Sequence, residues 1–316
     1  MVAVSLKKKL VRNTWTSVDA ALRLRLREKA PPGYFPAFPL GQAMDGVMTV
    51  GEVVESRADG YAPGDTVRHA AGWRDYAVVP AGSRALGGIG ALTKVDVSLA
   101  PAPEHLGVLG PAGYTAYAGL LHVAGLRDGD VVWVSAAAGS VGSLVAQLAK
   151  LRGHRVVGSA GSPEKVRYLR DELGLDAAFD HRSGPVADLL RQAAPDGIDV
   201  YFDNVGGDHL EAALGALRKS GRVALCGMVA EYEAEMPLPG PRNLMLAVTK
   251  DLTIRGFRVS SLTHLVPEMT RELAVLVRAG RLRCRETVVE GLANAPAALA
   301  GLLHGENLGK TLVRLG

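Results

Sequence analysis

The chain has 316 residues, of which 48% are hydrophobic and 22% are charged, and its formal net charge is +4. This length allows a large buried core and two domains, and the composition excludes long disordered stretches. Aromatic residues make up only 5% of the chain and the basic residues are scattered, which argues against a nucleic-acid-binding protein. Its two cysteines, Cys226 and Cys284, are too few for a disulfide framework or a four-thiolate zinc site, so we expect reduced core thiols.

The N-terminal residues 1–10 include Lys7-Lys8-Lys9, but the apolar segment of a signal peptide does not follow them. No apolar stretch reaches the roughly 20 residues that a membrane-spanning helix needs. We therefore expect a cytoplasmic protein that has neither a membrane nor a nucleic acid as a partner. The next part of the chain has short β-like runs separated by glycine and proline. Strands are predicted over 47–54 and 76–79, with a turn at 63–65, and this indicates a partly antiparallel β region.

From about residue 109 the pattern changes to strands that alternate with helices. This alternation is typical of βαβ units and of a parallel sheet that is covered on both faces. After residue 257 a helix, a strand, a helix and a last strand return the chain to the β-rich part. The predicted strands are 130–135, 155–159, 177–179, 198–202, 222–226, 252–257, 286–289 and 311–315, and the predicted helices are 141–151, 163–173, 185–194, 209–217, 267–279 and 295–303.

A glycine-containing turn follows the first strand of the alternating part. The sequence reads Ala137-x-Gly139-x-x-Gly142, which is the dinucleotide-binding fingerprint with alanine in place of its first glycine. Gly139 would let the backbone approach a pyrophosphate, and Gly142 would let the helix lie close to the strand, so that free amides at the helix start meet the phosphates. The alternative is a tight strand-to-helix turn without a ligand, but the surrounding βαβ series favours a Rossmann domain.

The end of the second strand indicates which nicotinamide cofactor is bound. An NAD enzyme carries a carboxylate there for the ribose 2′-hydroxyl, whereas this chain has Gly158-Ser159-Ala160-Gly161-Ser162-Pro163-Glu164-Lys165. Serine hydroxyls, free amides and Lys165 can bind a 2′-phosphate, and Glu164 belongs to the first turn of the next helix. Lys165 could also be a solvated surface charge. We interpret the segment as a site for NADPH.

Further motifs follow one another along nearly the whole chain, and together they are far more specific than any single one. The motifs are Val11-Arg12-Asn13 with Ser17-Val18-Asp19, Gly113-Tyr114-Thr115-Ala116-Tyr117, Ala136 to Gly142, Gly161 to Lys165, Phe202-Asp203-Asn204-Val205-Gly206-Gly207, Cys226-Gly227 with Tyr232, and Glu306-Asn307-Leu308-Gly309-Lys310. With them the chain resembles the zinc-free branch of the medium-chain dehydrogenase/reductase superfamily, namely the prostaglandin reductases (leukotriene B4 12-hydroxydehydrogenases) and the alkenal double-bond reductases.

The resemblance implies an α/β fold, in which a Rossmann domain with a doubly wound parallel sheet (109–259) is set inside a discontinuous, β-rich GroES-like catalytic domain (1–108 and 260–316). It also implies a homodimer. Tyr232 is the expected catalytic residue, although an aromatic side chain that merely covers a loop is the alternative. The expected NADP-binding residues are Thr115, Ala138, Gly139, Ser140, Val141, Gly142, Ser159, Gly161, Ser162, Lys165, His181, Arg182, Asn204, Gly206, Cys226, Gly227, Tyr232, Phe257, Val259 and Asn307.

Some positions depart from the family's pattern. His181 stands where the family often has tyrosine near the adenosine phosphate, and Arg182 is the alternative ligand. Residues 1–9 are short and rich in lysine where the family has an additional hairpin. Asp45 stands where an uncharged or basic residue is more usual. A substrate pocket is expected from Trp15, Tyr34, Met44, Trp73, Tyr232 and residues 242–245.

We expect no zinc, because the first hundred residues lack cysteine and His69 and His105 stand alone. Without a metal to polarise a carbonyl, the expected reaction is NADPH-dependent reduction of the C=C bond of an α,β-unsaturated ketone or aldehyde. One alternative is an NADPH:quinone oxidoreductase of the same superfamily. Another is a non-catalytic NADPH-binding redox sensor.

Overall fold

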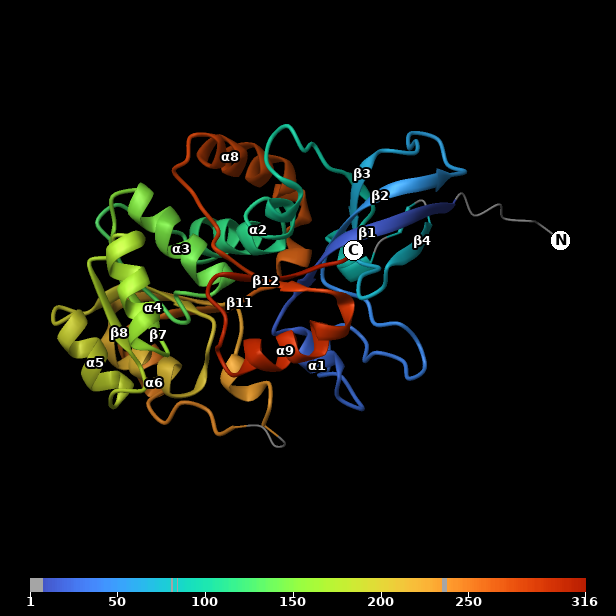
Figure 1. Cartoon of the computed structure of the whole chain (residues 1–316). Helices are drawn as coiled ribbons and strands as arrows, with labels where there is room; N and C mark the ends of the chain where they lie inside the picture. The colour runs from blue at the N-terminus through green and yellow to red at the C-terminus, as the bar shows by residue number, and fades with distance from the viewer. Residues whose placement is uncertain (1–7, 81, 84, 235–237) are drawn as a thin grey trace.

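A computed structural model describes residues 8–80, 82–83, 85–234 and 238–316. Two sheets lie beside one another (Figure 1), and one of them is a parallel sheet in the order β11-β10-β9-β6-β7-β8. Along the chain, β6 comes first, in the middle of the sheet, β7 and β8 extend the sheet to one edge, and β9, β10 and β11 then extend it to the other edge. This is the Rossmann order. The strands are β6 (Val131–Val134), β7 (Arg155–Ala160), β8 (Ala177–Asp180), β9 (Ile198–Asp203), β10 (Leu217–Leu225) and β11 (Thr253–Gly256).

The parallel sheet is buried on both faces, as the sequence predicts. All of β6 is buried, and its residues alternate between two core clusters: Val132 and Val134 pack in one, Val131 and Trp133 in the other. Such burial on both faces explains the continuous apolar run of this strand. The covering helices are α3 (Ser140–Leu151), α4 (Pro163–Arg167) with a π-type continuation (Tyr168–Glu172), α5 (Val186–Ala193) and α6 (Gly207–Ala216).

The second sheet has the order β12-β13-β1-β2-β3-β5, with β4 paired to β1, and it forms the GroES-like domain. Its central strand β1 is antiparallel to β2, β4 and β13, whereas β12 and β13 are parallel. The last strand of the chain therefore lies beside the first described one, as expected for a discontinuous domain. The strands are β1 (Lys8–Val18), β2 (Thr49–Ser56), β3 (Thr66–His69), β4 (Tyr76–Pro80), β5 (Thr93–Lys94), β12 (Glu286–Glu290) and β13 (Lys310–Arg314).

Helices α2 (Pro111–Tyr117) and α8 (Val266–Arg278) pack against each other where the two sheets meet. Gly113, of the motif Gly113-Tyr114-Thr115-Ala116-Tyr117, lies inside α2. A Cβ atom there would lie 1.8 Å from the Val108 carbonyl oxygen, so glycine is needed for close packing and not for a turn. A π-type turn (Ala118–Val123) continues α2, and the remaining helices are α1 (Leu22–Arg25), α7 (Met245–Thr249) and α9 (Ala295–Leu303).

Short 3₁₀ turns complete the secondary structure at Ala102–Leu106, Val229–Glu231, Val259–Ser261, Thr263–Leu265 and Leu292–Asn294. Both cysteines are free, as expected. Within the described ranges, no helix combines the length and the apolar character that crossing a bilayer requires. The expectation for a signal peptide and for the lysine-rich start falls largely on residues 1–7, outside the described residues.

Candidate active site

The turn between β6 and α3 is built for close backbone approach. Ala136 has a φ of 47°, and the Ala137 amide donates to the Ser159 carbonyl (2.9 Å). A Cβ atom at Gly142 would lie 2.3 Å from the Ala136 carbonyl oxygen, so only glycine allows α3 to start here. Since the first amides of a helix have no partner within it, those of Ser140, Val141 and Gly142 are available at the end of the strand. The turn from Ala138 to Gly142 thus offers backbone amides at the start of a helix, and its binding of a pyrophosphate stays a prediction.

Two serine hydroxyls beside this turn lack partners. The Oγ atoms of Ser140, at the start of α3, and Ser159, near the end of β7, are buried and form no hydrogen bond with any described residue. Buried hydroxyls are normally satisfied, so these two indicate room for a polar ligand. The residues that the sequence assigns to a dinucleotide thus fit such a group.

A cationic cluster lies at the ends of β7 and β8. The Gly161 Cβ position would lie 3.0 Å from His181 Nε2 and 3.4 Å from Arg182 Nε. Lys165 Nζ donates to the Gly305 carbonyl (2.6 Å). The pKa values of Lys165 and His181 are both lowered, first by burial and then by the Arg182 charge. This cluster therefore favours an anion.

Ser162 has a structural partner in the same cluster. Its Oγ caps α4 by accepting from the Lys165 amide (3.3 Å). This cap fixes the first turn of α4 and hence the root of the Lys165 side chain. Glu164 lies in that first turn, as predicted.

The loops after β6 and β9 meet where the strand order reverses, which is where open α/β sheets bind ligands. Asn204 donates through Nδ2 to the Ser135 carbonyl (2.7 Å), and its amide donates to Ser135 Oγ (2.9 Å). The fully buried Asp203 accepts through Oδ1 from the Tyr201 hydroxyl (2.7 Å) and from the Gly206 amide (2.8 Å). Burial raises the pKa of Asp203.

These contacts position Asn204 and Gly206, and sequence reasoning missed the two residues that provide them, Ser135 and Asp203. Asp203 could have been found from the sequence, because it is a carboxylate directly after the predicted apolar strand 198–202. A carboxylate that is buried there needs several hydrogen-bond donors around it.

The loop that carries Asn307 reaches back to the phosphate turn. Asn307 is buried and donates through Nδ2 to the Gly309 carbonyl (2.9 Å), while the Gly309 amide donates to the Ala138 carbonyl (2.8 Å). Gly309 has a φ of +71°, and its Cβ position is only 1.8 Å from the Arg285 carbonyl oxygen, so both backbone and space require glycine. The C-terminal part of the β-rich domain is thereby joined to the Rossmann turn.

A cavity of about 720 Å³ lies beside the ends of β10 and β11. Three of the residues predicted to bind NADP line it, namely Cys226, Gly227 and Phe257. The Phe257 ring packs edge-on against Phe202, and burial raises the pKa of the Cys226 thiol to about 12, so that this thiol stays protonated. The other lining residues are Pro31, Pro32, Gly33, Tyr34, Leu225, Met228, Arg255, Gly256, Arg258, Ser261 and Leu262.

Two further predicted residues lie next to this region but are not among the lining residues. Thr115 is half-buried on α2, one turn before Gly119, whose Cβ position would touch the Phe257 ring. Val259 follows Phe257 closely and packs partly buried against the main core cluster.

Tyr232 is not among the residues that line the cavity, but it contacts one of them, Gly227. Its hydroxyl is 3.1 Å from the Cβ position of Gly227, and its pKa is raised above the ordinary value, first by burial and then by Tyr34. The phenol is therefore a hydrogen-bond donor at neutral pH. Arg27 holds this segment, since its Nη2 donates to the Glu231 (2.9 Å) and Tyr232 (3.3 Å) carbonyls. Arg27 was missed, because nothing in the basic run 23–29 distinguishes it.

The expected substrate pocket is corrected in part. Tyr34 lines the cavity, but Trp15, Met44 and Trp73 pack in core clusters of the β-rich domain instead. Residues 242–245 are mostly at the surface, where the Arg242 guanidinium bonds Glu211 (2.7 Å). Sequence order could not show which turns meet across the two domains.

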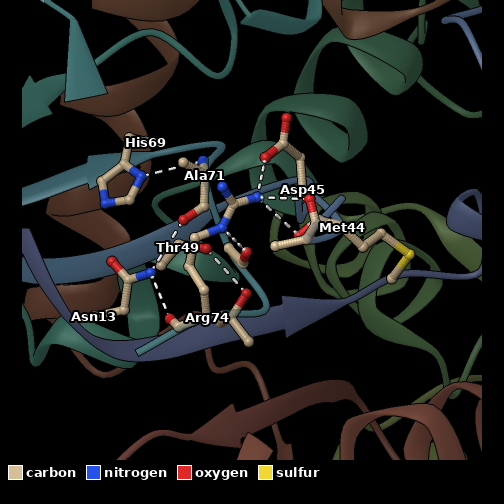
Figure 2. Close-up of polar contacts among 10 residues, drawn as sticks. Asn13, Met44, Asp45, Thr49, His69, Ala71 and Arg74 are labelled. Atoms are coloured by element: carbon tan, nitrogen blue, oxygen red, sulfur yellow. Dashed lines mark hydrogen bonds and ion pairs between the residues drawn. The ribbon is translucent and has the colours of Figure 1, made fainter. Parts of the chain in front are cut away.

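Asp45 belongs to a polar network in the β-rich domain (Figure 2). Its carboxylate pairs with Arg74 (2.5 Å), while Asn13 Nδ2 donates to the carbonyls of Ala71 (3.0 Å) and Arg74 (2.8 Å). The buried His69 accepts the Ala71 amide through Nδ1 (3.1 Å). These contacts hold the loops 43–46 and 71–75 on β1. Among the residues that the structure describes, no three His, Cys, Asp or Glu side chains are grouped so as to hold a metal ion.

Comparison with known proteins identifies the family. One family model, "N-terminal domain of oxidoreductase", matches residues 5–85, and another, "Zinc-binding dehydrogenase", matches residues 140–275. The NADP(+)-dependent 2-alkenal reductase of Nicotiana tabacum is 38% identical over 305 residues, covering 96% of this chain and 86% of that protein. Prostaglandin reductase 1 of Mus musculus is 40% identical over 270 residues, covering 84% of this chain and 79% of that protein.

The chain belongs to the zinc-independent alkenal and prostaglandin reductase family of medium-chain dehydrogenases/reductases. A solved structure agrees with this membership: CurA of Vibrio vulnificus in complex with NADPH is 32% identical, with a TM-score of 0.89, and the alignment covers 100% of this chain and 92% of that one. The family predicted from the motifs is confirmed, and so is the fold class.

Proposed function

We propose that this family member is an NADPH-dependent reductase of the C=C bond of α,β-unsaturated ketones or aldehydes. The observation that carries the proposal is the pair of cations Lys165 and Arg182, with the neutral imidazole of His181 beside them, next to a turn with free amides and at a strand end without the carboxylate that would hold a ribose hydroxyl. Relatives named as NADP(+)-dependent 2-alkenal reductase and prostaglandin reductase support the reaction class.

In this proposal, three groups of residues would hold three parts of NADPH. The amides of residues 138–142 hold the pyrophosphate. Lys165, Arg182 and His181, with Gly161, Ser159 and Ser162, hold the adenosine phosphates. Asn204, Gly206 and Asn307 line the groove, and Thr115, Cys226, Gly227, Phe257 and Val259 surround the nicotinamide. When bound, NADPH would supply the hydride for the β-carbon, and a water molecule would give the proton to the α-carbon, so that the enolate becomes the saturated carbonyl.

Tyr232 is the proposed catalytic residue. Because burial keeps its Oη protonated, Tyr232 donates a hydrogen bond to the substrate carbonyl oxygen, where negative charge develops during the reaction. Tyr34 faces it from the β-rich domain, and Phe257 supplies an apolar wall that excludes water. The Cys226 thiol, with its pKa raised to about 12 by burial, takes no part in proton transfer.

The organisation around this site is part of the same proposal. Residues 109–259 form the NADP-binding domain, and residues 1–108 and 260–316 form the catalytic domain. The protein acts in the cytoplasm, and its two free thiols fit a reducing compartment. It is a homodimer, joined through β11, which is an edge strand of the parallel sheet with no strand on its outer side among the described residues.

The test follows NADPH absorbance with a simple enone, a quinone and a saturated ketone as acceptors. We expect turnover with the enone, a saturated ketone as product, and at least about tenfold lower kcat/KM with NADH. Turnover with the quinone alone would indicate a quinone oxidoreductase instead. Binding of NADPH without turnover of any acceptor would indicate a redox sensor.

A further inference from the structure

A second cavity, of about 690 Å³, is lined by residues of α3, of the π-type segment Tyr168–Glu172 and of the chain that joins α8 to β12. Figure 1 shows where α3 and α8 lie in the fold. None of its lining residues belongs to the proposed NADPH site or to the substrate cavity. Lys150, on its rim, lies ten residues after Ser140, which is about 15 Å along a helix. The volume is that of a small-molecule site.

The charge of this cavity is strongly positive. Lys150, Arg281, Arg283 and Arg285 line it, and Glu172 is the one carboxylate among the lining residues. Lys150 pairs with Asp176 (3.0 Å) and Arg285 with Glu172 (2.8 Å). The guanidinium groups of Arg281 and Arg283, in contrast, form no hydrogen bond or ion pair with any residue that the structure describes.

The arginines are presented from a fixed backbone. Burial alternates along residues 281–285: Leu282 is buried and Cys284 is half-buried against the core, whereas Arg281, Arg283 and Arg285 are exposed. Gln147 of α3 binds both backbone polar groups of Arg283, since its Nε2 donates to the Arg283 carbonyl (2.8 Å) and its Oε1 accepts the Arg283 amide (3.1 Å). Alternate residues of an extended chain lie about 7 Å apart, so these charges form a short row.

The floor of the cavity is apolar. Leu151, Leu173 and the buried ring of Tyr168 line it, and the Arg285 guanidinium lies 5.6 Å from the centre of that ring. An apolar floor beside the two unpaired guanidinium groups of Arg281 and Arg283 suits a molecule with a planar or aliphatic body and a phosphate, because guanidinium binds phosphate oxygens in a bidentate manner. We propose that this cavity is a second ligand site, outside the active site, for a small organic phosphate.

The test uses phenyl phosphate as the probe and the full-length protein saturated with NADPH, so that the dinucleotide site is already filled. We expect saturable binding in calorimetry, and a dissociation constant that rises about tenfold for each guanidinium lost in Arg281→Gln/Arg283→Gln. Arg170→Gln is the matched control, since Arg170 is an exposed arginine on the same π-type segment that does not line the cavity. Phenol should bind at least about tenfold more weakly than phenyl phosphate.

Three results would overturn the proposal. These are equal binding of phenyl phosphate by the double variant and the wild type, equal weakening by the Arg170→Gln control, and an absence of saturable binding. Binding of single-stranded RNA or of anionic phosphatidylglycerol vesicles, lost in the double variant while phenyl phosphate does not bind, would also reject a small-molecule site. Enone reduction by the double variant should be unchanged without the probe, which separates this site from the proposed activity.

Discussion

Replacing Gly142 by alanine tests the turn on which cofactor binding depends. The added Cβ would lie 2.3 Å from the Ala136 carbonyl oxygen and 2.9 Å from the Ala137 Cα, and both are backbone atoms. Ala136 already has a φ of 47°, so the turn cannot easily move away. Overpacking of this kind costs about 1–3 kcal/mol, so we expect a lower urea midpoint even without cofactor. The displaced start of α3 should also weaken NADPH binding at least about tenfold.

Gly139→Ala is the matched control, because its Cβ would meet only the Ala136 oxygen, at 3.2 Å, and its φ of −82° suits alanine. Its stability should stay within about 1 kcal/mol of the wild type, since alanine also restricts the unfolded chain. Its affinity for NADPH should still fall, because the methyl group would occupy the space of the approaching phosphate. Urea unfolding by circular dichroism and NADPH fluorescence titration measure both effects. A Gly142→Ala protein with wild-type midpoint and affinity would refute the reasoning.

Further predictions concern single contacts. Lys165→Gln should raise the KM for NADPH about tenfold and leave that for NADH nearly unchanged; an equal rise for both would contradict the phosphate assignment. Tyr232→Phe should lower kcat about tenfold or more without changing the Kd for NADPH, and unchanged kcat would exclude its role. Asp130→Asn should destabilise the fold by about 3–5 kcal/mol, because it leaves Arg222 buried without its charge partner, whereas Asp130→Leu/Arg222→Met should recover much of the urea midpoint. Burial lowers the pKa of His209 from 6.5 to about 3. As the pH falls below 6.5, the unfolded chain therefore protonates this histidine before the folded chain does. The free energy of unfolding then decreases between pH 6.5 and pH 3, by at most about 1.4 kcal/mol per pH unit. The urea midpoint of His209→Phe should depend less steeply on pH than that of the wild type.

The alternating part of the fold could be predicted because its signals are local. A strand such as β6 is apolar throughout since both its faces are buried, and the glycine turn after it requires specific backbone space. The long strand β1 was not among the predicted strands. It contains Asn13 and Thr16, which look like surface residues, yet both are buried and bonded to other segments, Asn13 to loop carbonyls and Thr16 to Thr49 (2.9 Å).

Contacts between distant segments limited the prediction of the site. The sequence could nominate Lys165 and Asn307 from motifs, but nothing local brings residues 31–34 to the end of β11. Arg27 donates a hydrogen bond to the Tyr232 carbonyl, which lies 205 residues further along the chain. Such contacts arise only when the two domains pack together. They decide which residues line the cavity, and of the expected pocket residues only Tyr34 does so.

The ammonium group of Lys165 donates a hydrogen bond to the Gly305 carbonyl, 140 residues away along the chain. Arg182 donates similarly to His304 (3.4 Å). Since an ammonium has three N–H donors and a guanidinium five, both cations can keep these carbonyls while they bind a phosphate on the adenosine ribose. NADH has no phosphate there for these cations to bind. The discrimination between the two nucleotides is then set partly by how firmly the C-terminal loop holds the two cations in place for the phosphate.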